Sequence, residues 1–285
     1  MQSSKKSLLA FFAITFGFSW FFWLFDVLSS LHVIALPFSY MILFVIGAHG
    51  PLVGALVITY QSGGWGAVKT LLKSGFKLRM PLVWWLLILL LPVIFSGLPL
   101  WLNVSLNQFQ GDRSLLAQPL MILPTFLMMF FLGGSFQEEF GWRGFALPRL
   151  LEKWNPLAAS LILGVVWGIW HLPLFFIAET GQYFMPLGIF LIMVEAFSIL
   201  TTWVYLRTGR NLFSALLFHT SINTCLSIFP PIIKITGGNQ VGLTYLMVGY
   251  ALVALIVLVA ERGLFFRPVD PVLRKDGVQW LQTMK

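Results

Sequence analysis

The sequence predicts an all-α, polytopic membrane protein in the cell membrane, and composition and patterning both support this fold class. Of the 285 residues, 58% are hydrophobic and 10% are charged, whereas soluble domains carry about 25% charged residues. The mean hydropathy is +0.87. These values exclude an ordinary soluble enzyme, a disordered chain and a disulfide scaffold. We therefore expect a single transmembrane domain over residues 1–285.

About eight apolar stretches are expected to cross the membrane. Each has roughly the ~20 residues that a crossing helix needs, and none shows the alternating pattern of a barrel strand. The first stretch follows Lys5 and Lys6 but is too long for a signal peptide and lacks a cleavage site. Between the second and third stretches, residues 62–80 predict an amphipathic segment on the membrane surface. The stretches cover about residues 7–25, 36–60, 81–101, 119–138, 156–178, 183–206, 212–229 and 244–260.

The distribution of positive charge predicts the orientation of the chain. An even number of spans places both termini on one side, together with the second, fourth and sixth loops. All of the 18 Lys and Arg residues except Arg113 and Lys234 fall on that side, so the positive-inside rule predicts that both termini are cytoplasmic. Topology thus accounts for the net charge of +8, and we expect no nucleic-acid partner. The sequence does not indicate an oligomeric state.

Two adjacent glutamates at the end of the fourth stretch begin a candidate functional site, because ionisable groups inside spans are costly and are functional candidates by default. If the helix continues through this stretch, Glu139 and Arg143 lie at i and i+4 and are expected to form a salt bridge. Glu138 then points about 100° away and is left free for chemistry.

Two histidines and an asparagine on later stretches complete the candidate cluster. His171 lies deep in the fifth stretch, where Pro173 is expected to kink the helix. His219 and Asn223 are four residues apart and share one face of the seventh stretch. At ~1.5 Å per residue from the cytoplasmic helix ends, the depths are about 15 Å for Glu138, about 22 Å for His171 and about 11 Å for His219. We expect one polar cavity that opens towards the cytoplasm.

These residues resemble the three motifs of the CAAX protease and bacteriocin-processing family, which includes the type II CAAX prenyl endopeptidases. The motifs are Glu138-Glu139-x-x-x-Arg143, Trp167-x-x-x-His171 and His219-x-x-x-Asn223, within a core of about residues 119–229. The family usually has phenylalanine where this chain has Trp167, which keeps an aromatic packing residue. The resemblance implies hydrolysis of peptide bonds in membrane-embedded or lipid-anchored substrates.

The resemblance also implies a role for each matching residue. Glu138 with His171 would hold and deprotonate the attacking water, and His219 and Asn223 would donate hydrogen bonds to the tetrahedral oxyanion. Glu139 and Arg143 would shape the site. A zinc ion held by Glu138, His171 and His219 is the alternative, but the chain lacks H-E-x-x-H, and we favour a reaction without a metal or another cofactor.

Two other functions compete with proteolysis. A bacteriocin-immunity or scaffold protein would keep the cluster for packing, and a secondary transporter would use Glu and His as a proton relay, although the chain shows no duplicated halves. Three ionisable residues of the spans lie outside the motifs. Asp26 has no assigned role, and His49 is expected to be structural. For Glu195, a packing role and a role in lining the cavity are equally expected. Gly133 and Gly134 are expected to allow close helix packing.

Overall fold

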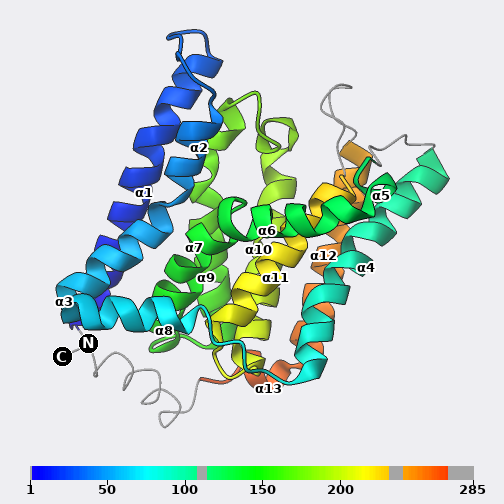
Figure 1. The fold of residues 1–285 in the computed structure, drawn as a ribbon. Coiled ribbons are helices and arrows are strands. Elements are labelled where there is room, and N and C mark those ends of the chain that lie inside the picture. Colours follow the sequence, from blue (N-terminus) through cyan, green and yellow to red (C-terminus); the bar gives the residue numbers. More distant parts are fainter. Residues whose placement is uncertain (1, 108–113, 231–239, 269–285) are drawn as a thin grey trace.

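A computed structural model describes residues 2–107, 114–230 and 240–268, and the regular structure of these ranges is entirely helical (Figure 1). The expected all-α fold is confirmed. The longer helices are α1 (Gln2–Ser30), α3 (Gly50–Ser74), α4 (Leu82–Asn107), α9 (Pro156–Trp170), α10 (Leu187–Arg207), α11 (Leu212–Ile228) and α12 (Gln240–Ala260). The shorter helices are α2 (Met41–Ala48), α5 (Ser114–Ala117), α6 (Ile122–Leu132), α7 (Ser135–Gly141), α8 (Leu147–Leu151) and α13 (Arg262–Phe265).

Seven helical stretches of the described residues are long and apolar enough to cross a membrane. They are Lys6–Ser30, Met41–Ser74, Leu82–Asn107, Pro119–Leu151, Pro156–Phe176, Leu187–Arg207 and Gln240–Ala260. The helix α11 is apolar but shorter, with 17 residues, so the expected count of about eight is close. It lies inside the bundle, where it contacts α4, α6, α7 and α10. This central position explains why nearly all of its residues are buried.

The fifth expected stretch ends earlier than predicted. Helix α9 stops at Trp170, His171 caps its C-terminus, and a 3₁₀ turn over Leu172–Phe176 follows. Pro173 explains the difference, because proline has no backbone N–H for the helical ladder and its ring clashes with the preceding turn. The expected kink is therefore a helix end, and His171 lies at this end instead of inside a continuous helix.

Helix α3 bends near its middle, which separates a spanning half from a second half. The stretch Met41–Ser74 has 34 residues, about 51 Å if straight and thus far longer than the ~30 Å hydrocarbon core. The backbone leaves helical geometry at Gly63 and at Gly64, where φ is 62°. Trp65, just after the bend, is 68% exposed. Figure 1 shows the second half running across one end of the bundle, which agrees with the expected surface segment.

Contacts between distant parts of the chain place several helix ends at the same end of the bundle. The side chain of Asn211, before α11, donates to the backbone oxygen of Lys77, after α3, at 2.9 Å. Arg207 at the end of α10 donates to Glu261 after α12 at 2.9 Å. Figure 1 shows the start of α1 and the helix α13 at this end as well. The basic loops that topology groups together therefore meet, although Arg113, Lys234, Arg274, Lys275 and Lys285 lie outside the described residues.

We predict that this end of the bundle faces the cytoplasm. A reporter that is active only in the cytoplasm, fused after Lys285, should give full signal in intact cells, because most cations of the chain lie on that side. A reporter that is active only outside the cytoplasm should be silent at the same position. The opposite pair of signals would contradict the predicted orientation.

Candidate active site

The site begins where the chain breaks between α6 and α7. Gly134 has φ of 105°, which strongly favours glycine because an L side chain is strained there. Its N–H donates to the Gln137 side-chain oxygen at 2.7 Å, so Gln137 satisfies a backbone group at the start of the new helix. This break starts α7 at Ser135 and places Glu138 in its first turn, with Glu139 directly after it, inside the bundle.

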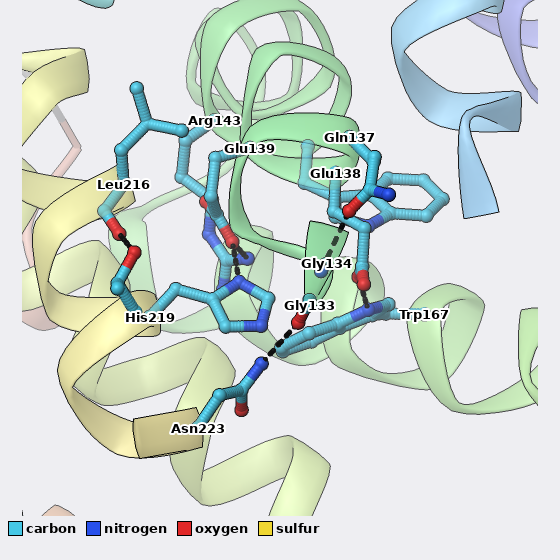
Figure 2. A network of polar contacts seen from close by, with 12 residues as sticks. Gly133, Gly134, Gln137, Glu138, Glu139, Arg143, Trp167, Leu216, His219 and Asn223 are labelled. Atoms are coloured by element: carbon cyan, nitrogen blue, oxygen red, sulfur yellow. Dashed lines mark hydrogen bonds and ion pairs between the residues drawn. The ribbon is translucent and has the colours of Figure 1, made fainter. Parts of the chain in front are cut away.

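Glu139 has two hydrogen-bond partners at once. Its Oε1 accepts a hydrogen bond from Arg143 at 3.0 Å and another from His219 Nδ1 at 2.8 Å (Figure 2). Glu139 and Arg143 are fully buried, so each neutralises the charge of the other where water cannot. The expected salt bridge is therefore present. The contact with His219 joins α7 to α11 and was not expected from the sequence.

The carboxylate of Glu138 has one oxygen held and one oxygen open. Oε2 accepts hydrogen bonds from the indole N–H groups of Trp167 at 2.6 Å and Trp142 at 3.3 Å. Among the described residues, Oε1 accepts no hydrogen bond, and a methyl group added at Gly134 would lie 2.5 Å from it and 3.6 Å from His219 Nε2. Glu138 is thus less free than expected, and its open oxygen lies against Gly134, on the side where His219 Nε2 is also found.

The two histidines have defined ring orientations. His171 Nδ1 lies 2.8 Å from the backbone oxygen of Trp167, and His219 Nδ1 faces the Glu139 carboxylate. Both partners are acceptors, so Nδ1 carries the proton in each ring and Nε2 of a neutral ring is an acceptor. The His171 ring packs edge-on against Trp170 and Phe190.

Asn223 lies one turn beyond His219 on α11 and belongs to the same cluster. Its side-chain N–H₂ donates to the backbone oxygen of Gly133 at 2.7 Å, and Figure 2 shows it beside the break before α7. The amide has two N–H groups, so one remains for another acceptor. The structure therefore brings Asn223, His219 and Glu138 to the Gly133–Gly134 turn. His171 is connected to this group indirectly, because it bonds to the backbone of Trp167, whose side chain bonds to Glu138.

The three residues suggested for zinc do not fit a shared metal ion in this arrangement. Among the described residues, no three His, Cys, Asp or Glu side chains are close enough to hold one ion. Trp167 contacts each member of the suggested set: it donates to Glu138, and its ring centre lies 6.0 Å from that of His171 and 5.6 Å from that of His219. No chemical step is therefore assigned to a metal.

The remaining ionisable residues of the spans lie outside this cluster. Glu195 packs against Gly164, where α10 meets α9. His49 caps α2, and its Nδ1 lies 2.7 Å from the Val45 backbone oxygen, as expected for a structural histidine. Asp26 is buried in α1, and its carboxylate accepts no hydrogen bond from the described residues.

Two tryptophans and one glycine were not recognised as site residues from the sequence. Trp142 and Trp167 donate to Glu138, and Gly134 lies close to its open oxygen. The position of Trp167 in the second motif was a usable signal, but an aromatic residue there predicts packing before it predicts a hydrogen bond. The role of Gly134 depends on its positive φ, which no sequence pattern near it indicates.

Comparisons with known proteins agree with the motifs. Residues 119–225, which hold every site residue named above, match the family described as Rce1-like, type II CAAX prenyl endopeptidase Rce1-like. Over 242 residues the chain is 26% identical to CAAX prenyl protease 2 of Methanococcus maripaludis, and the alignment covers 80% of this chain and 84% of that protein. The resemblance found in the sequence is confirmed: the chain is similar to the Rce1-like type II CAAX prenyl endopeptidases.

Proposed function

We propose that this chain is an intramembrane endopeptidase that cuts membrane-embedded or lipid-anchored substrates. The observation that carries the proposal is the close approach of two groups, since the open oxygen of Glu138 and Nε2 of His219 both lie near the Cα of Gly134. A base and an electrophilic group this close together suit attack of water on a peptide carbonyl. The name of the Methanococcus maripaludis relative supports a prenylated C-terminal tail as the substrate.

In the proposed reaction, Glu138 takes a proton from water as the water oxygen attacks the carbonyl carbon of the substrate. His171, with the lone pair of Nε2 available, accepts a hydrogen bond from the same water. The carbonyl oxygen becomes an oxyanion that Asn223 stabilises with its second N–H and His219 stabilises through Nε2. The C–N bond then breaks, and the proton held by Glu138 passes to the leaving amine.

The geometry of His219 adds a condition to this reaction. Because Nδ1 already donates to Glu139, Nε2 carries a proton only when the ring is an imidazolium cation. Donation to the oxyanion therefore requires the charged ring. The carboxylate of Glu139 stabilises that charge from the opposite side, and this assigns Glu139 a duty beyond its pairing with Arg143.

The proposal is tested by comparing membrane peptides in cells that carry the wild type or Glu138→Gln. Glutamine keeps the shape of the side chain but cannot accept the proton of water, so uncleaved precursors should accumulate in the variant at an unchanged protein level. Glu152→Gln, in the loop after α8, makes the same charge change away from the site and should give the wild-type pattern. Identical peptides in all three strains would favour the non-proteolytic scaffold or immunity protein.

Metal independence is a separate prediction. Strong chelators should leave cleavage by the purified protein largely intact, because no three potential ligands converge among the described residues. Cleavage of a prenylated peptide before and after chelation measures the effect, and elemental analysis of the same preparation is the control. Stoichiometric zinc, together with activity that is lost on chelation and restored by added zinc, would contradict the prediction.

A further inference from the structure

We infer that Trp167 is a positioning residue that fixes the carboxylate of Glu138 for water activation, a role that rests on the proposed function. The indole N–H of Trp167 donates to Glu138 Oε2 at 2.6 Å. Trp167 is buried, so water does not compete for this bond. With Oε2 held from α9, rotation of the carboxylate is restricted, and Oε1 stays directed towards Gly134 and His219.

Trp167 also contacts the other polar residues of the site. The guanidinium carbon of Arg143 lies 4.9 Å from the centre of its ring, within the range of a cation–π contact. The His219 ring packs edge-on against the Trp167 ring, with 5.6 Å between the ring centres. The backbone oxygen of Trp167 accepts a hydrogen bond from His171. One residue thus sets the relative positions of groups from α7, α9 and α11.

The hydrogen bond distinguishes this role from packing alone. Phenylalanine, the usual residue at this motif position in the family that the chain resembles, fills a similar space but has no donor. Trp142 bonds to the same oxygen at 3.3 Å, a longer contact that restrains Glu138 less. Loss of the Trp167 donor should therefore free the carboxylate to rotate, even where the aromatic packing is retained.

The kinetic test compares Trp167→Phe with a matched variant. With an internally quenched, prenylated C-a-a-X peptide as the probe, Trp167→Phe should lower kcat about tenfold, as expected for losing a hydrogen bond to a charged group, while KM stays unchanged. Trp203→Phe is the control, because its indole also donates to a carboxylate, that of Glu261, outside the site. It should keep the wild-type kcat. Wild-type kcat in a folded Trp167→Phe protein would overturn the inference.

A spectroscopic test does not depend on activity. In protein labelled with ¹⁵N at the tryptophan indoles, one downfield indole signal should disappear in Trp167→Phe and move in Glu138→Gln, because the charged acceptor has been replaced. A signal that does not respond to Glu138→Gln would overturn the inference. If Trp167→Phe does not fold, benzothienylalanine at this position keeps the bicyclic shape without the N–H and should show the same loss of kcat.

The results separate this inference from the proposed function. If Glu138→Gln abolishes cleavage and Trp167→Phe does not affect it, the protease assignment stands and the positioning role is wrong. If Glu138→Gln cleaves normally, the proposed function fails, whatever the tryptophan variants do.

Discussion

Replacing Glu139 with alanine is expected to destabilise the folded protein by about 3–5 kcal/mol, the usual cost of removing one partner of a buried ion pair. Arg143 is fully buried, so its guanidinium would keep its charge without its hydrogen-bonded counterion and without access to water. His219 would lose the acceptor of Nδ1 at the same time. Equilibrium unfolding in mixed detergent micelles, followed by tryptophan fluorescence, measures the change.

The double variant Glu139→Ala/Arg143→Met is the matched control for this prediction. Methionine removes the stranded charge and keeps much of the side-chain volume, so the double variant should be more stable than the single one. A double variant that is more stable than the single variant shows that the two residues interact in the folded protein, as expected for a buried ion pair. A Glu139→Ala protein that unfolds like the wild type would show that the buried pair does not stabilise the fold.

Replacing Gly134 with alanine is expected to lower the rate of cleavage about 100-fold, the scale of loss when reacting groups are displaced by about 1 Å. The added methyl would lie 2.5 Å from Glu138 Oε1, so the carboxylate must move away from the position in which it is proposed to activate water. The φ of 105° at this position adds backbone strain of about 1–3 kcal/mol.

Steady-state cleavage and thermal unfolding of the same preparation separate the two effects of Gly134→Ala. Gly249→Ala on α12 is the control, because its added methyl would meet its nearest neighbour at an ordinary 3.5 Å, and both its activity and its stability should be close to wild type. A folded Gly134→Ala protein with wild-type kcat would place the reaction elsewhere.

Local spacing was enough to predict part of this site. The separation of Glu139 and Arg143 by four residues predicted their ion pair, which the structure contains. The depth estimate left His171 about 7 Å deeper than Glu138. In the structure Trp167, one turn before His171, accounts for this difference in depth. It lies about 16 Å from the start of α9, close to the depth estimated for Glu138, and donates a hydrogen bond to Glu138.

Other features of the site depend on contacts between helices that lie far apart in the sequence. The bond between His219 and Glu139 links residues separated by 80 positions, and nothing in either motif specifies which ring nitrogen faces the carboxylate. The break at Gly134 also depends on its surroundings, since the apolar pattern on both sides equally predicts one continuous helix. The roles of the candidate catalytic residues remain predictions from the motifs.

The distance along the chain between Glu139 and His219 also sets an order of assembly during synthesis. At about 5–20 residues per second, a ribosome needs roughly 4–16 s to make the 80 residues that separate them. Arg143 and Glu139 are available to pair within the first second, whereas His219 and Asn223, which are proposed to bind the oxyanion, are made last, with α11. The proposed catalytic set is therefore incomplete until α11 has entered the bundle.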